Sequence, residues 1–200
     1  MLKIGWQFFA VQHGHEIPTI DVALVTIDDG GGTEIGLKTA SKVAVNPQTE
    51  TQDANKLLVK GVLIAQKPPK TTITGNTIVL TDNVLNPELL VVLQGGRITY
   101  KSGSSGPISK YEPPVAGSDE SGKPFTLNMY SAIYNAAGTI TGYEKVSYPN
   151  CQGTPWCPGS EDNVWRVAEY TINSAPNTGE SPYVIDYVDD LPDVSPVPGA

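Results

Sequence analysis

Glycine and proline interrupt this sequence along its whole length, and their spacing is the strongest constraint on its fold. The chain of 200 residues contains 20 glycines and 17 prolines. Both residues break helices, so the apolar segments between them are short and few could form a long helix. Short apolar segments separated by turn residues are typical of all-β domains. The sequence therefore predicts an all-β fold.

Strands are predicted where β-branched or alternating apolar residues lie between turn signals. The predicted strands cover residues 20–27, 33–45, 71–81, 125–134, 140–148, 164–172 and 183–188. Residues 42–65 are predicted to form one long hairpin, whose polar tip lies at residues 51–56. The first nine residues lack the long apolar core of a signal peptide and have the pattern of a first strand.

One short helix is predicted near residues 87–94. Asn86 can cap its first turn, Pro87 suits the first helical position, and Glu88 complements the positive end of the helix dipole. Gly95 can adopt the left-handed conformation that closes a helix. Two turns of helix are not stable alone in water, so the apolar residues of this helix are expected to pack on a sheet.

A single β domain is predicted over residues 1–190. Within it, residues 101–124 are rich in glycine, serine and proline, and they are predicted to be a long flexible insertion loop. Residues 191–200 contain three prolines and are predicted to be an extended C-terminal arm.

The charge of the chain argues against one class of partner. The formal net charge is −8, and it arises mostly in residues 101–200, where 12 acidic residues oppose 5 basic ones. Such a surface cannot neutralise many phosphates, so tight nucleic-acid binding is not expected. No segment reaches the roughly 18 apolar residues that span a bilayer, so no membrane is expected as a partner. Since neither a signal peptide nor a membrane span is evident, the protein is expected to stay in a reducing cytoplasm. Cys151 and Cys157 are expected to be free thiols there.

One stretch resembles a phosphate-binding loop. Three glycines at residues 30–32 are followed by Gly-Leu-Lys-Thr at residues 36–39. A phosphate loop needs glycine directly before lysine and a helix directly after it, so that backbone donors and lysine converge on the ligand. Here Leu37 separates the two residues and the segment is predicted to be a strand, so nucleotide binding is not expected.

His13, His15, Cys151 and Cys157 are the residue types that hold zinc. The cysteines are more widely spaced than in zinc motifs, and the histidines lie far from them in the sequence. No metal site is therefore predicted, and the cysteines are interpreted as free thiols or as a pair that forms a bridge only on oxidation.

Catalytic carboxylates are also not predicted. Paired acidic residues occur at 28–29, 161–162 and 189–190, in turn-like or terminal stretches where water screens their charges. The chain has two histidines and no Gly-x-Ser-x-Gly sequence, so no nucleophilic triad is evident. We predict no catalytic, cofactor-binding or metal residues and no cofactor, and the protein is not expected to be an enzyme.

Three stretches of the sequence are similar to one known family. They are residues 42–50 (Lys-Val-Ala-Val-Asn-Pro-Gln-Thr-Glu) with 59–68, residues 81–89 with 93–96, and residues 148–155 with 179–192. In order and spacing they resemble the tail tube, or major tail, proteins of phages of Gram-positive bacteria and of phage-tail-like particles. The resemblance covers most of residues 35–192 and none of the first 34.

The resemblance implies a fold, an assembly and a location. The fold is a β-sandwich or barrel with one packed helix, and subunits form hexameric rings that stack into a hollow tube for genome delivery. The implied location is the virion tail, assembled in the host bacterial cytoplasm. The implied partners are further copies of the chain and other tail proteins such as the tape measure, the terminator and, in a contractile tail, a sheath. DNA is a partner only in transit through the lumen, whose acidic wall would repel its phosphates.

Free sheet edges supply a mechanism for such assembly. An exposed strand edge tends to pair with another chain, and in a tube each subunit can pair its edge with that of a neighbour. Residues 42–65, 101–124 and 191–200 are the segments expected to reach adjacent subunits. We hypothesise that residues 51–56, as the hairpin tip, make the contact between rings.

Two other classes of function fit the sequence less well. The first is another virion β protein, such as a neck, baseplate or spike component or an immunoglobulin-like adhesion module, which would stay discrete in solution. The second is a hydrolase that uses carboxylates of residues 101–124, which predicts a deep pocket with perturbed carboxylates.

Overall fold

Antiparallel strands make up most of the computed structural model, which describes residues 17–31, 34–101 and 106–194. The main sheet contains β1 (Thr19–Asp28), β2 (Glu34–Leu37), β3 (Ala40–Gln52), β6 (Lys70–Asp82), β9 (Phe125–Tyr134), β10 (Ile140–Gly153), β11 (Ala168–Ser174) and β12 (Val184–Val188). Its strand order is β2-β1-β9-β10-β11-β6-β3, and β12 also pairs with β10. One helix, α1 (Pro87–Gln94), lies among these strands, so the predicted all-β fold with one short helix is confirmed.

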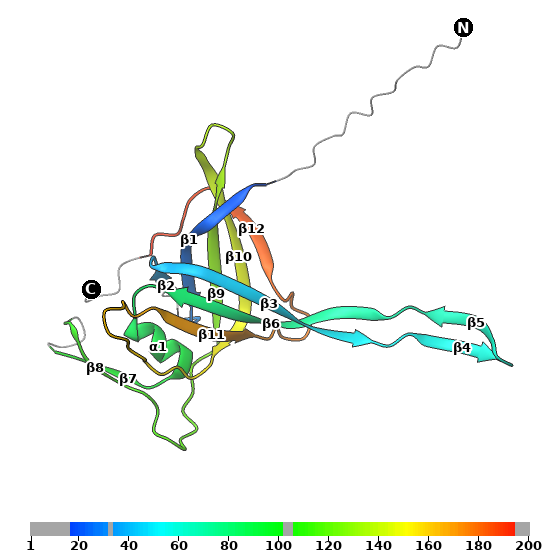
Figure 1. Ribbon diagram of the computed structural model, residues 1–200, viewed down its shortest axis with the longest axis horizontal. Coiled ribbons are helices and arrows are strands. Elements are labelled where there is room, and N and C mark those ends of the chain that lie inside the picture. The colour runs from blue at the N-terminus through cyan, green and yellow to red at the C-terminus, as the bar shows by residue number, and fades with distance from the viewer. Residues whose placement is uncertain (1–16, 32–33, 102–105, 195–200) are drawn as a thin grey trace, which may run out of the picture.

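The sheet is folded over into two layers. In Figure 1, β1, β9 and β10 run across the direction of β3, β6 and β11. Strand β10 belongs to both layers, because it pairs with β9 and β12 along most of its length and with β11 at its end. Its pairing with β9 shifts register between Tyr148 and Cys151, and Asn150 within the shift has a φ of 47°. Such a bulge bends a strand, and here it directs β10 from one layer to the other.

The core lies between the two layers. Val25, Ile27 and Leu127 come from the first layer and are fully buried. Leu80 and Ile172 come from the second and are also fully buried. Alternate residues of a strand point to the same face, so the alternation that predicted these strands also selects their buried residues.

Helix α1 begins and ends as its sequence predicts. The Asn86 side chain accepts a hydrogen bond from the Glu88 backbone N–H at 3.0 Å, and Pro87 occupies the first helical turn. Gly95 closes the helix with a φ of 81° and donates its N–H to the Val91 carbonyl at 2.9 Å. Leu89, Leu90 and Leu93 are buried, so the helix packs on the core as expected.

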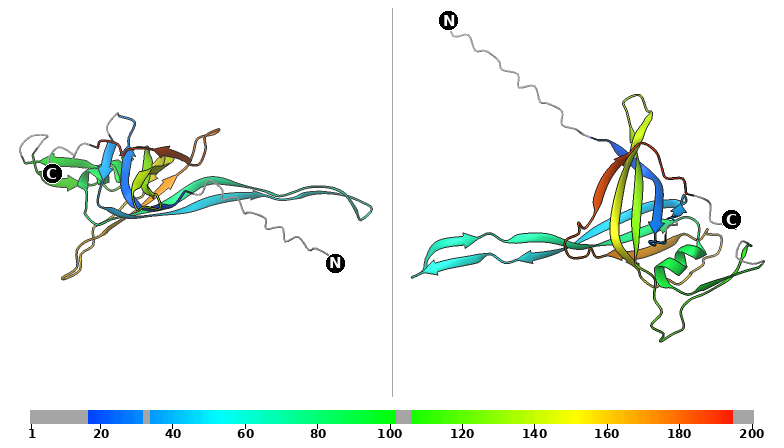
Figure 2. Two further views of the ribbon diagram at one scale, coloured as in Figure 1. Left: turned by 90° about the horizontal axis from the view of Figure 1, so that it is seen from above. Right: turned by 180° about the vertical axis from the view of Figure 1, so that it is seen from behind.

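A long two-stranded arm extends from the body of the molecule (Figures 1 and 2). Its inner part is formed by β3 and β6, which pair from Ala40–Asp82 out to Gln52–Lys70. Its outer part is formed by β4 (Asn55–Val59) and β5 (Val62–Lys67). Both faces of the outer strands are exposed.

The predicted tip of this hairpin is wrong. The chain reverses at Lys60 and Gly61, not at residues 51–56, and residues 57–65 are two paired strands instead of one. Lys60 and Gly61 have φ angles of 51° and 81°, as in the two-residue turn whose twist matches a β-hairpin. Lysine rarely adopts this conformation, so the sequence signals the turn weakly, and the polar residues 51–56 lie along the arm.

Four further features differ from the prediction. Residues 101–124, expected to be a loop, contain β8 (Ile108–Glu112), which pairs with β7 (Arg97–Tyr100). The strand expected over residues 33–45 is divided by a turn between β2 and β3. Residues 164–167, expected to begin a strand, are irregular. Strand β10 continues to Gly153, beyond the predicted strand end at residue 148.

The expectations for the chain ends fall largely outside the described residues. The first strand expected over the first nine residues and the two histidines lie there, as do residues 195–200 of the C-terminal arm. The start of that arm contacts the body, because Val194 is buried against Leu24 and Tyr130. Among the described residues, no helix has the length and apolar character needed to cross a membrane.

Candidate functional site

The outer part of the arm carries several aliphatic side chains that are exposed to solvent. We call residues 53–69 the arm tip. Six of its aliphatic side chains have exposed fractions between 49% and 61%: Leu57, Leu58, Val59, Val62, Leu63 and Ile64. Figures 1 and 2 show that no other described element lies beside this part of the arm.

Such a ribbon gains stability when another molecule covers it. A two-stranded hairpin alone is marginally stable in water. Full burial of a leucine, valine or isoleucine side chain contributes about 1.5–3 kcal/mol. Since about half of each of the six side chains is still exposed, covering them would contribute about 5–10 kcal/mol before the entropic cost of association. The arm tip is therefore a candidate interaction surface.

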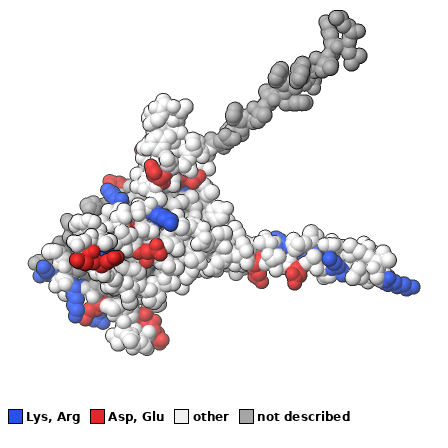
Figure 3. Space-filling view, viewed as in Figure 1, with Lys and Arg blue, Asp and Glu red and all other residues white. Residues whose placement is uncertain are grey.

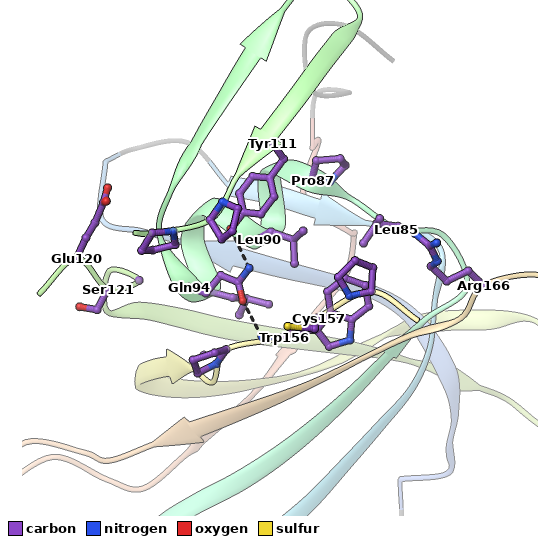
Figure 4. Close-up of a pocket in the computed structure, with 17 residues that line it drawn as sticks. Leu85, Pro87, Leu90, Gln94, Tyr111, Glu120, Ser121, Trp156, Cys157 and Arg166 are labelled. Carbon is purple, nitrogen blue, oxygen red and sulfur yellow. Dashed lines mark hydrogen bonds between the residues drawn. The ribbon is translucent and has the colours of Figure 1, made fainter. Parts of the chain in front are cut away.

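A cavity of about 590 Å³ lies beside α1, and we call it the α1 cavity. Its walls are α1, the segment that follows β8 and the loop that follows β10, as Figure 4 shows. Leu90, Pro114 and Trp156 are typical of its apolar lining. The charged residues that line it are Glu120 and Arg166.

Gln94, the last residue of α1, connects the walls of this cavity (Figure 4). Its side-chain oxygen accepts a hydrogen bond from the Trp156 backbone N–H at 2.6 Å. Its side-chain nitrogen donates to the Tyr111 hydroxyl oxygen at 2.8 Å, and that hydroxyl donates to the Gly95 carbonyl at 2.9 Å. Because these bonds join α1 to β8 and to the loop that follows β10, the walls of the cavity are fixed by contacts within the subunit itself.

Two glycines allow the neighbouring segments to approach α1. A Cβ atom on Gly153 would lie 2.6 Å from the Cβ of Leu93, and one on Gly122 would clash with the Leu93 carbonyl oxygen. Both positions therefore require glycine. The irregular segments around the cavity are packed against the helix, and the cavity is part of the fold.

The arm tip and the loops around the α1 cavity carry opposite charges. The arm tip, residues 53–69, contains three lysines and one acidic residue, Asp53, for a net charge of +2. Residues 111–124 and 153–167 together contain five acidic residues and two basic ones. Figure 3 shows lysine and arginine at the far end of the arm, acidic residues on the arm nearer the body, and residues of both charges on the body.

The glycine-rich stretch near residue 36 packs against the C-terminal segment. Gly36 lies in β2, and the residues that follow it form a turn into β3 instead of a helix. A Cβ atom on Gly36 would lie 2.5 Å from a methyl group of Val194. The glycine thus allows the C-terminal segment to pack on β2, which is a structural role.

The two cysteines differ in environment. Cys151 is fully buried, its thiol donates to the Tyr148 carbonyl at 3.2 Å, and burial raises its pKa to about 11. Cys157 is exposed and lines the α1 cavity. Both are free thiols. Within the part of the chain that the structure describes, no three histidine, cysteine or acidic side chains are grouped as metal ligands.

The paired carboxylates lie on the surface. Asp28 and Asp29 accept hydrogen bonds from the backbone N–H groups of Gly30 and Gly31 at 2.8 and 2.9 Å, which fixes the turn after β1. The pairs at 161–162 and 189–190 are also exposed. The α1 cavity is the kind of pocket that a hydrolase would need, but Glu120 is the one carboxylate residue in its lining and it is exposed.

The sequence indicates the apolar arm but not the α1 cavity. A run of six aliphatic residues around a Lys-Gly pair is visible in the sequence, although its exposure is not. Gln94, Tyr111 and Trp156 come from three separate segments, and no spacing among them predicts that they meet. The aromatic and proline content of residues 111–114 and 155–158 is the one local signal that could have indicated an apolar pocket.

Comparison with known proteins leaves the family open. No protein-family model matches this sequence, and no curated protein matches it. Among solved structures, the chain is similar to one in the cryo-EM structure of the anti-feeding prophage baseplate, with 9% sequence identity and a TM-score of 0.29. That alignment covers 91% of this chain and 95% of the other. A TM-score of this size does not establish a common fold.

Proposed function

We propose that this chain is a structural subunit of a phage or phage-like tail tube. It self-assembles into stacked hexameric rings that enclose a hollow conduit for genome delivery. The exposed apolar arm tip is the observation that most supports this role, because a second copy of the chain is the partner that a self-assembling subunit always has available. The arm also includes residues 42–50 and 59–68, two parts of the sequence that resemble tail tube proteins.

Open sheet edges support closure of a ring. Among the described residues, β2 pairs only with β1, and β3 pairs only with β6. The outer edge of β12 is also unpaired, and Val184, Ile185 and Tyr187 on this strand are 45%, 45% and 56% exposed. Such edges accept strands from neighbours, and identical subunits that do so around an axis form a closed ring.

In this proposal the arm joins one ring to the next. From the sequence, we assigned the contact between rings to residues 51–56. We now assign it to the arm tip, where the chain reverses and the aliphatic side chains lie. The acidic body is suited to a lumen through which DNA passes without binding. The location would be the virion tail, and further partners would be the tape measure, the terminator and, in a contractile tail, a sheath.

Removal of the arm tip tests this function. Gln52 and Lys70 are paired across the arm, so residues 53–69 can be replaced by Asn-Gly, which forms a tight hairpin turn at that register. We expect the shortened protein to fold and remain monomeric or form single rings, whereas the full chain forms open-ended hollow tubes on electron microscopy grids when concentrated. Tubes from the shortened protein would contradict the role of the arm. A full chain that forms only discrete particles would support a neck, baseplate or adhesion protein instead.

A further inference from the structure

The arm tip and the α1 cavity lie at opposite ends of the molecule. Figure 1 shows the arm at one end of the long axis and α1 at the other, and both views of Figure 2 agree. One copy of the chain therefore presents an apolar projection and an apolar cavity that it cannot fill itself. We infer that the α1 cavity receives the arm tip of a second copy, an inference that rests on the proposed function and adds the receiving site to it.

The two surfaces match in chemistry. The cavity lining is largely aliphatic, aromatic and proline side chains, and the six residues that flank the Lys60-Gly61 turn of the arm tip are all aliphatic. A volume of about 590 Å³ is in the range of pockets that enclose a medium-sized ligand, so it accepts a few aliphatic side chains and not the whole arm. Insertion therefore involves the residues around Lys60 and Gly61.

Their charges match as well. The arm tip has three lysines against one acidic residue, and the loops that form the cavity have an acidic excess. Lys60 is at the turn of the arm, and Glu120 lines the cavity. Opposite charges on two surfaces accelerate their encounter and fix their orientation, while the apolar contacts supply the affinity. A second arm is a poor partner for the first by this criterion, because like charges would face each other.

The cavity needs no rearrangement to accept the arm. The hydrogen bonds of Gln94 to the Trp156 backbone and to Tyr111 fix the relative positions of its walls in the single subunit. Preformed sites avoid the entropic cost of ordering on binding. Because arm and cavity are different surfaces, their contact does not close a two-fold dimer, and each added copy presents a new free arm and a new free cavity.

Cysteine cross-linking tests this contact directly, because the chain has one exposed described cysteine and it lines the cavity. The first protein carries Leu63→Cys with Cys157→Ser and supplies a thiol only on its arm tip. The second protein is the unchanged chain and supplies Cys157. Leu63 is 49% exposed, so its replacement leaves the core intact. Cys151 is present in both proteins, and its burial keeps it from reacting.

We expect a disulfide-linked dimer on a non-reducing gel when the two proteins are mixed at assembling concentration with a mild oxidant. Each protein alone should give no such dimer. The matched control carries Thr51→Cys with Cys157→Ser, since residue 51 lies about 30 Å from the turn along the arm and should not reach the cavity.

The possible results separate this inference from the proposed function. A dimer from the Leu63→Cys, Cys157→Ser protein alone would mean that arms pair with one another and would overturn the inference. Hollow tubes from the mixture without the cross-link would also overturn it while leaving the tail-tube function intact. A specific cross-link without tubes would support the inference and count against the tail-tube function.

Discussion

Three threonine substitutions on the arm tip test whether its aliphatic side chains are buried on assembly. The variant Val59→Thr, Val62→Thr, Ile64→Thr keeps β-branched residues in both strands, so the hairpin should form as before. Val59 and Val62 are directly paired across the turn, and the three side chains are 49%, 61% and 60% exposed. Substitutions at such exposed sites usually change the free energy of unfolding of a monomer by less than about 0.5 kcal/mol.

Assembly should respond much more strongly than folding. The two valine substitutions replace a methyl group with a hydroxyl, and Ile64→Thr replaces an ethyl group with one. Burying a hydroxyl without a partner costs about 1–3 kcal/mol. Scaled by the half of each side chain that assembly can still cover, the three changes weaken subunit association by about 2–5 kcal/mol. That range corresponds to a roughly 30- to 5,000-fold rise in the concentration needed for polymerisation.

Sedimentation across a concentration series, with electron microscopy of the pellets, measures this concentration. The matched control is Ile20→Thr with Ile140→Thr, two exposed apolar positions off the arm. The control should polymerise like the unchanged chain, and chemical unfolding should give similar stability for all three proteins. If the triple variant polymerises at the same concentration as the unchanged chain, the arm tip is not a buried contact and the reasoning fails.

Three other predictions follow from particular residues. Reaction with N-phenylmaleimide should modify Cys157 and spare buried Cys151, which mass spectrometry can show. The added ring should block the α1 cavity and stop tube growth, and growth at an unchanged rate would count against the cavity as a contact site. Asn86→Ala should lower the free energy of unfolding by about 1 kcal/mol in urea, because the N–H of Glu88 loses its acceptor, and no change would mean that water replaces the cap. Burial raises the pKa of Cys151 from 9.0 to about 11. Burial and the nearby Asp82 charge raise the pKa of Tyr170 from 10.0 to about 12, so the folded state favours the neutral forms of both groups. The resulting stability is complete below pH 9 and is lost as the pH rises toward 12, and Cys151→Ala should flatten the part of that decline between pH 9 and 11 in urea titrations.

The features that depend on neighbouring residues could be predicted from the sequence. The helix is one example, because Asn86, Pro87 and Gly95 act on backbone groups within one turn of themselves. The strands of the core are a second example. The alternation of apolar and polar residues along each strand selects its buried face, whatever the order of strands in the sheet. The sequence also predicts a hairpin where the arm lies, but it does not predict the length of the arm or the position of its turn.

The features that depend on distant residues were decided by the tertiary structure. The position of the arm turn follows from the pairing of β3 with β6 and of β4 with β5, and a single glycine after a lysine signals it poorly. The α1 cavity exists because Gln94 joins segments that lie 17 and 62 residues away in the chain. Local propensity determines which residues form a strand or a helix. A cavity and a protruding arm arise from how these elements pack, and packing depends on contacts between residues far apart in the sequence, which local patterns do not show.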